Sequence, residues 1–289
     1  MFKAILIFLS FLFISCSSTN NEDLISNQNI YENNLLEDYE IYEKAKYYIS
    51  NNLLDLALIE LDKIEVLFPS SKFSNKGMLV KAYIYFLRKD YEKTRAIAEN
   101  YKIYYPGSKD IVYANYLDAM TYFVLIKKPN YSQKNTRIAQ EKFNFILNAY
   151  PNSKYEIDII TKKQIINNNL AANKLSTAKF YLNRKNLSGS LIYLKDIYEN
   201  HNTSLSIEET LFLIVKIYDL IEEKNLAEKY AAILSYNYPN SHWYEKSYDI
   251  INNNEDKKID NENLFKKYSP LKIFKLKQLE EDFKIQRID

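Results

Sequence analysis

Tyr150-Pro151-Asn152-Ser153 is a short stretch whose pattern returns along the chain and decides the fold. Three further copies join an aromatic residue, proline, a small or polar residue and serine: Phe68-Pro69-Ser70-Ser71, Tyr105-Pro106-Gly107-Ser108 and Tyr238-Pro239-Asn240-Ser241. Successive prolines lie 37, 45 and 88 residues apart, and the last gap is about two repeat lengths. We therefore expect a unit without proline inside that gap, with its turn at Tyr198-Glu199-Asn200-His201-Asn202.

Each copy of the pattern combines a helix stop with a helix start. Proline lacks an N–H and disfavours the helical conformation in the residue before it, so it ends one helix. The serine two residues later can accept a hydrogen bond from the first free amides of the next helix. The chain has only 3 Gly and 6 Pro, which suits helices joined by short turns better than a β-sandwich. The sequence therefore predicts an all-α fold.

Small residues recur at two fixed offsets upstream of these turns. They are Ala45, Ala57, Ala82, Ala139, Ala178, Ser190 and Ala227. Small side chains let the two helices of a hairpin approach closely, while larger apolar residues fill the space beside them. The pattern resembles the tetratricopeptide repeat, a helix–turn–helix unit of about 34 residues. The resemblance predicts a solenoid of five helical hairpins within residues 37–251, ending in a capping helix, with Ala45, Ala82, Ala178 and Ala227 buried inside hairpins.

Two departures from a regular repeat are also predicted. The third unit has about eight extra residues between its helices, around Lys127-Lys128-Pro129-Asn130-Tyr131. The fourth unit opens with a long helical stretch, from about Tyr155 to Lys185, that contains neither Pro nor Gly. Residues 252–289 are predicted to form a polar linker and an amphipathic C-terminal helix that carries Leu276, Leu279 and Phe283.

The N-terminus has the features of an export signal. Lys3 gives a positive start, residues 4–14 are apolar except for one serine, and Ser15-Cys16 ends the run. The run is shorter than the roughly 20 residues of a transmembrane helix. It resembles a bacterial lipoprotein signal, so we predict a signal peptide over residues 1–15, lipid attachment at Cys16 and a flexible tether over residues 16–36. An ordinary signal peptide with an incidental cysteine is the alternative.

The composition argues against several kinds of chemistry. The chain holds 39 basic and 37 acidic residues, a balance that gives no general attraction to nucleic acid. Its glycines are isolated, so no phosphate-binding loop of the common types is expected. His201 and His242 lie far apart near repeat turns; we predict that both face solvent and that they bind no metal. The carboxylates are expected on exposed helix faces. We predict a binding protein without cofactor or metal, not an enzyme.

The lipoprotein signal, tether, five repeats, insertion and long helix occur together with the strings Tyr150-Pro151-Asn152-Ser153-Lys154-Tyr155 and His242-Trp243-Tyr244. From about residue 13 to residue 250 the chain resembles the BamD family. The resemblance implies a lipid-anchored scaffold on the periplasmic face of the outer membrane, in the β-barrel assembly machine. Its C-terminal repeats would hold a BamA-like barrel-forming subunit. Its N-terminal repeats would receive the C-terminal strand signal of unfolded outer-membrane β-barrel proteins.

One region departs from that family. Familiar members carry an arginine used in the BamA contact where this chain has Ile192-Tyr193, so that ion pair cannot be carried over. Another class of function also stays open at this point. Other periplasmic repeat adaptors, such as a secretin pilotin or a cell-envelope division factor, are lipoproteins too.

The partner surfaces are predicted on the first helix of each hairpin, because repeat solenoids present an extended concave face. The N-terminal contact residues are predicted to be Tyr42, Tyr48, Lys81, Tyr85, Phe86 and Arg88. Aromatic slots near a cation would suit barrel substrates, which end in an aromatic residue and a free carboxylate. The alternative for Tyr48 and Tyr85 is core packing between repeats. Tyr218, Trp243 and Tyr244 are predicted to hold the barrel-forming subunit.

Overall fold

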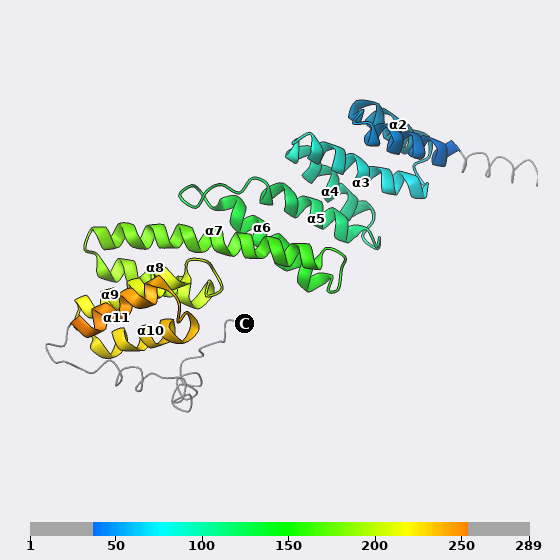
Figure 1. Cartoon of the computed structure of the whole chain (residues 1–289). Coiled ribbons are helices and arrows are strands. Elements are labelled where there is room, and N and C mark those ends of the chain that lie inside the picture. Colours follow the sequence, from blue (N-terminus) through cyan, green and yellow to red (C-terminus); the bar gives the residue numbers. More distant parts are fainter. Residues whose placement is uncertain (1–36, 254–289) are drawn as a thin grey trace, which may run out of the picture. The chain divides into compact units, whose positions relative to one another are not determined.

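The computed structural model describes residues 37–253, and every regular element in that range is a helix (Figure 1). The predicted signal peptide, Cys16, the tether and the C-terminal segment from residue 254 lie outside the described residues. The helices pair into five successive hairpins followed by one last helix, as the repeat pattern predicts. The chain divides into two compact units, with the boundary after Ser108.

Unit 1 holds the first two hairpins. Residues 37–50 are helical and pair with α2 (Leu54–Leu67), while α3 (Lys72–Leu87) pairs with α4 (Tyr91–Tyr104). Its core joins alanines to larger aliphatic side chains: Ala45, Ala57, Leu61, Ile64 and Ile84 are each at most 1% exposed. The unit therefore has its own hydrophobic core.

Unit 2 holds three hairpins and the capping helix. These are α5 (Ile111–Phe123) with α6 (Lys134–Ala149), α7 (Glu156–Asn183) with α8 (Leu187–Asn200), α9 (Ile207–Leu220) with α10 (Lys224–Asn237), and α11 (His242–Asn253). The predicted insertion is the connection 124–133, and the predicted long helix is the 28-residue α7 (Figure 1). Both departures from the regular repeat are confirmed.

The small residues occupy the positions that the repeat register predicts. Ala45, Ala82 and Ala178 are fully buried, and Ala227 is 1% exposed. The equivalent positions on the second helices are Ala57, Thr94, Ala139, Ser190 and Ala227, and all of these are buried. Each lies where a larger side chain would hold the two helices apart.

The turns between hairpins share one backbone arrangement. The second helix of each hairpin ends on a residue that donates its N–H to the carbonyl of a fully buried residue four positions earlier. We call these five buried residues the anchors: Ile64, Tyr101, Ile146, Ile197 and Leu234. The donating residues are Phe68, Tyr105, Tyr150, His201 and Tyr238.

His201 thus takes the place of the aromatic residue in the unit without proline. The prediction that it faces solvent was wrong, since it is only 6% exposed. Its Nδ1 lies 2.6 Å from Asn167 Oδ1, and it donates because that amide points its nitrogen at Thr203 Oγ1. Burial, and then the charge of Lys174, lower the pKa of His201, while Asp196 opposes them. His242, by contrast, is exposed.

The predicted serine caps are found at two of the four proline turns. Ser71 accepts from the Phe73 N–H at 2.9 Å, and Ser241 accepts from the Trp243 N–H at 3.1 Å. Each serine also donates to an acidic residue 33 positions earlier, Asp38 and Glu208 respectively. After Pro106 and Pro151 the next helix begins two residues later than it does after the other two prolines. Ser108 and Ser153 therefore lie before the capping position.

The turns inside four of the hairpins use a left-handed residue other than glycine. Asn52, Lys89, Lys185 and Glu222 have φ between 58° and 62°. The next N–H in each turn closes onto the carbonyl of Tyr48, Tyr85, Tyr181 or Tyr218 at 2.8–3.0 Å. This is the usual way in which a left-handed residue ends a helix, and glycine usually fills the position.

No helix of the described residues is long and apolar enough to cross a membrane.

Candidate partner-binding surfaces

The predicted N-terminal contact residues do not form one cluster. The Tyr42 ring packs 5.2 Å from Phe73 at the start of α3, and Phe86 packs 5.7 Å from Tyr91 at its end. Phe73 and Phe86 are thirteen positions apart, which is about 20 Å along a helix. Tyr42 and Phe86 are both partly exposed, so two separate aromatic positions lie along α3.

The two predicted cations are already bound by carboxylates of α2. Lys81 Nζ lies 2.6 Å from both Asp62 Oδ1 and Glu65 Oε2, and its side chain is 17% exposed. Burial lowers the pKa of Lys81, but its hydrogen bonds to the two carboxylates outweigh burial and the net pKa is raised. Arg88 pairs with Asp55, whose side chain is 87% exposed. Arg88 therefore has the more accessible partner of the two.

Three of the predicted tyrosines occupy one repeated position. Tyr48, Tyr85 and Tyr218 are the residues whose carbonyls close the turns inside hairpins, and Tyr181 is the fourth. Tyr48 and Tyr85 pack against the core of unit 1 and are partly buried. Tyr218 is 6% exposed and stacks on Tyr230 at 5.7 Å between ring centroids. These positions stabilise the hairpins, and Tyr218 offers little surface to a partner.

The capping helix presents a different aromatic group. Trp243 is partly exposed; its ring lies 5.1 Å from that of Phe212 on α9. Lys246 Nζ lies 4.7 Å from the Trp243 ring centroid, a cation–π distance. Tyr244 is also partly exposed and packs edge-on against Tyr248 at 6.3 Å. Aromatic residues that are half covered and lie beside a cation are typical of protein–protein contacts.

Hairpin four carries an exposed apolar residue in the region where the family resemblance implies an arginine. Ile192 on α8 is 68% exposed. Its neighbour Tyr193 stacks on Tyr181 at 5.6 Å with the rings 16° from parallel. A Cβ at Gly189 would approach Tyr181 Cδ1 at 2.8 Å, so glycine is needed there for this stack. The result is a fixed platform with one exposed aliphatic side chain.

The amide side chains of α7 are the main feature that the sequence analysis missed. Asn169 and Asn173 donate to the carbonyls of Lys127 and Pro129, at 2.9 and 2.6 Å, and so hold the connection 124–133. On another side of the helix, Gln164 donates to the Thr203 carbonyl at 2.9 Å, and Asn168 accepts from the Leu205 N–H at 3.1 Å. The run of asparagines, which codon bias alone could produce, therefore fixes two loops of unit 2.

Some carboxylates lie in the core, contrary to the expectation that all would be on exposed faces. Glu60 is 5% exposed and is held by Lys44 at 3.0 Å and Lys63 at 3.1 Å. Burial raises the pKa of Glu60, but hydrogen bonds from the two lysines outweigh burial and the net pKa is lowered. Asp118 is equally buried and is paired with Lys142 at 2.7 Å. These acids hold helices together.

Comparisons with known proteins identify the family. Residues 36–234 match the family model YfiO, described as an outer membrane lipoprotein. The chain is 30% identical over 213 residues to the outer membrane protein assembly factor BamD of Rickettsia prowazekii, covering 74% of this chain and 85% of that protein. It is 29% identical to BamD of Caulobacter vibrioides, covering 66% of this chain and 63% of that protein. The chain also matches the crystal structure of PilW, a type IV pilus biogenesis factor, over 79% of this chain and 90% of that chain at 15% identity, with a TM-score of 0.32.

No group of three or more residues able to hold a metal ion occurs within residues 37–253. The helical hairpins and the assembly-factor relatives indicate a non-catalytic scaffold. The chain therefore belongs to the YfiO family of outer membrane lipoproteins, together with the BamD assembly factors, and has a role in outer-membrane protein assembly.

Proposed function

We propose that this protein is a scaffold, anchored at the periplasmic face of the outer membrane by a lipid on Cys16, that binds two partners. One is a BamA-like barrel-forming subunit, and the other is an unfolded outer-membrane β-barrel protein. Its family membership supports the assembly role, and the Ser15-Cys16 pattern supports the anchor. We assign one partner to each unit because separate, half-exposed aromatic positions occur in unit 1 and in unit 2.

Unit 1 is the proposed site for the barrel substrate. The terminal carboxylate of the substrate would bind Arg88 in place of Asp55. Displacing Asp55 costs little, because it is exposed and surface ion pairs contribute only about 0–1 kcal/mol. Phe86 lies on another side of the end of α3, where it packs on Tyr91 of α4, and would contact an aromatic side chain of the strand there. A strand of about six residues spans 20 Å and would reach the aromatic pair Tyr42 and Phe73 at the far end of α3. Lys81, held by two carboxylates, is the weaker candidate.

Unit 2 is the proposed site for the barrel-forming subunit. Trp243 and Tyr244 on α11 provide aromatic side chains that are already positioned by packing against Phe212 and Tyr248. Ile192 on α8 adds an exposed aliphatic side chain in the region where the family resemblance implies an arginine. We infer that this contact is apolar here and that the barrel-forming subunit from the same organism lacks the matching acidic residue.

The substrate site is tested with a peptide that ends in phenylalanine, in a free-acid and an amidated form. A charge-assisted hydrogen bond contributes about 1.5–3 kcal/mol, so Arg88→Gln should weaken free-acid binding about ten- to hundredfold. The amidated peptide should bind both proteins equally. Arg137→Gln on the exposed surface of α6 is the matched control. Equal weakening of both peptides by Arg88→Gln would contradict the proposed carboxylate contact.

The second site is tested by co-purification of the barrel-forming subunit with the solubilised lipoprotein. Truncating an aromatic side chain at the centre of an interface typically weakens binding by 2 kcal/mol or more, about thirtyfold. Trp243→Ala should therefore lose the subunit while peptide binding persists. Leu205→Ala, at an 87% exposed position of the same unit, should retain it. Full retention by Trp243→Ala would remove α11 from the interface.

A further inference from the structure

Both hairpins of unit 1 expose two apolar residues at one repeated position, whereas unit 2 exposes only one large apolar residue there, Tyr236. The two residues that follow an anchor by two and three positions end the second helix of each hairpin. In unit 1 these are Val66 with Leu67 and Ile103 with Tyr104. In unit 2 they are Asn148 with Ala149, Glu199 with Asn200, and Tyr236 with Asn237. The second helix ends with the same hydrogen bond in all five hairpins, so the difference at these two positions lies in the side chains.

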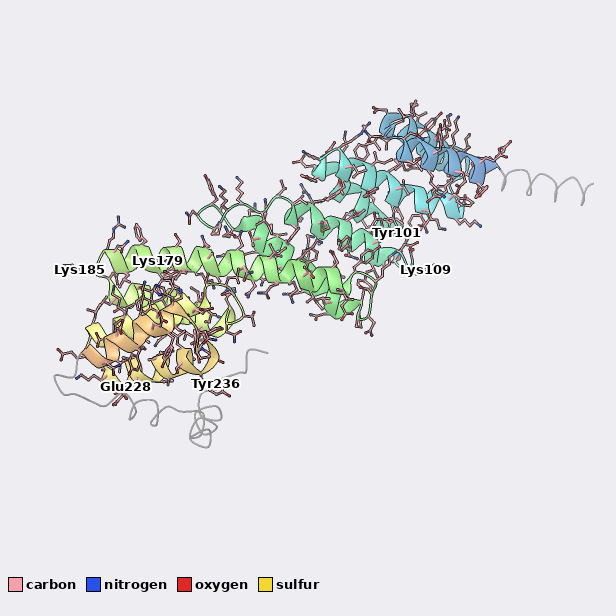
Figure 2. All side chains as sticks on the ribbon, in the orientation of Figure 1. Tyr101, Lys109, Lys179, Lys185, Glu228 and Tyr236 are labelled. Atoms are coloured by element: carbon pink, nitrogen blue, oxygen red, sulfur yellow. The ribbon has the colours of Figure 1, made fainter. Side chains whose placement is uncertain are left out.

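These four residues are among the most exposed apolar side chains of unit 1. Val66 is 76% exposed, Leu67 61%, Ile103 64% and Tyr104 66%. A residue two positions after an anchor lies about 200° around the helix from it, so Val66 and Ile103 point away from the core. Tyr101, the anchor of α4, is marked in Figure 2; its hydroxyl donates to Asn75 Oδ1 at 2.6 Å on the inner side.

The exposed side chains belong to one side of the unit. Equivalent residues of successive repeats lie along the same edge of a stack, so we expect the ends of α2 and α4 on the same side of the unit. Ile59, 51% exposed and two turns before Val66, extends the surface along α2. We call Ile59, Val66, Leu67, Ile103 and Tyr104 the apolar edge. It lies on second helices, whereas the proposed substrate contacts lie along α3, a first helix.

The length of the chain outside the structure points to what covers this edge. Only 20 residues separate Cys16 from the first described helix, so a lipid on Cys16 keeps unit 1 near the bilayer. A fully extended chain of that length reaches about 70 Å, and a flexible one averages roughly 25 Å. The acidic residues beside the edge, Asp62 and Glu65, share Lys81, so the lysine cancels one of their two negative charges and reduces their repulsion of anionic lipid headgroups.

We propose that the apolar edge of unit 1 rests on the membrane that carries the anchor, with its side chains in the lipid headgroup region. Aliphatic side chains flanked by a tyrosine suit that region, because tyrosine combines an apolar ring with a polar tip. This proposal rests on the proposed lipid anchor. The lipid would hold the protein at the bilayer, and the edge would fix which side of unit 1 faces it.

The test uses the full lipoprotein reconstituted into vesicles of phosphatidylethanolamine and phosphatidylglycerol. Val66→Cys and Ile103→Cys are each labelled with an environment-sensitive fluorophore, since acylated Cys16 leaves no other thiol. Ile157→Cys, at an 82% exposed position of unit 2, is the matched control. We expect blue-shifted emission and quenching by a lipid-borne quencher at positions 66 and 103 but not at 157. Water-like emission at both edge positions would overturn the proposal.

A second variant separates the edge from the anchor. Val66→Glu combined with Ile103→Glu, read with the fluorophore at Tyr104→Cys, should return that probe to water-like emission while the protein still floats with the vesicles. Failure to float would instead refute the lipid on Cys16. Emission that is unchanged by the two glutamates would overturn the edge. Protection at positions 66 and 103 in native outer membranes but not in protein-free vesicles would assign the edge to a protein partner and also overturn the proposal.

Discussion

Units 1 and 2 are built from the same hairpin, yet different side-chain contacts hold their elements in place. In unit 1, ion pairs cross between helices, from Glu60 to Lys44 and from Lys81 to Asp62. In unit 2, ion pairs also occur, but the long helix α7 adds amide side chains that hold two loops. The comparison teaches that the repeat register determines the backbone, while side chains outside the register determine how rigid the loops are and which surfaces stay exposed.

The largest effect is expected from enlarging a small residue in the register, because both units depend on it equally. Ala227→Leu should overpack hairpin five and destabilise the protein by about 1–3 kcal/mol. Ala82→Leu in unit 1 should have a similar effect, since both alanines are at most 1% exposed. Thermal melts of the two variants provide the measurement. An unchanged melt for either would mean that its unit does not follow the shared register.

The amide contacts of α7 are tested next, because they distinguish unit 2. Asn167→Ala removes the partner of His201 Nδ1 and the hydrogen bond to Thr203. A buried donor left without a partner costs about 1–3 kcal/mol. Because Asn167 itself is only half-buried, we expect the loss of stability to lie toward the lower end of that range. Hydrogen exchange should rise in residues 201–205 and not in unit 1. Exchange that rises equally in both units would contradict a local role.

A smaller, stabilising effect is expected at the left-handed turns. Glu222 adopts a φ of 61°, a conformation that glycine adopts without the strain of a Cβ. Glu222→Gly should therefore stabilise hairpin five by up to about 1 kcal/mol. Glu223→Gly, one residue on with a φ of −85°, is the control and should destabilise. Chemical denaturation compares the two, and a destabilised Glu222→Gly would mean that the left-handed conformation carries no strain.

The smallest effect expected is a difference in pH dependence between the units. His201 has a pKa below its ordinary 6.5, so the unfolded chain binds its proton more readily and stability falls as the pH drops below 6.5. Glu60 has a pKa below its ordinary 4.5, so its stabilisation is present above 4.5 and is lost at more acid pH. His201→Gln should reduce the change of the melting temperature between pH 6.5 and pH 5, and His242→Gln should not. Identical slopes for both would exclude His201 as the source.

The fold could be predicted from the sequence because its determinants are local and repeated. Proline, the preceding aromatic residue and the small residues such as Ala178 each have one physical role, and they recur in register. His201 was misassigned because its residue type was given more weight than its place in the repeat. In that register it aligns with Phe68 and Tyr150, and the alignment indicates a buried position.

The candidate surfaces were less predictable, because they depend on contacts between residues far apart in sequence. The sequence suggests that Lys81 and Arg88 are available cations, but in the structure carboxylates of α2 pair with both. The sequence suggests that Tyr218 is an aromatic residue at the surface, but in the structure it stacks on Tyr230. The loop contacts of Asn169 and Asn173 join residues 42 and 44 positions apart, and no periodicity within α7 indicates them.

Site-specific photo-crosslinking in living cells tests the central claim most directly, that the two units bind different partners. A photoreactive amino acid is placed at Phe86 in unit 1 or at Tyr244 in unit 2 of the lipid-anchored protein. We predict that the probe at 86 captures unfolded outer-membrane β-barrel proteins and that the probe at 244 captures the barrel-forming subunit. Capture of the same partner at both positions, or of the two partners in the opposite order, would contradict the account.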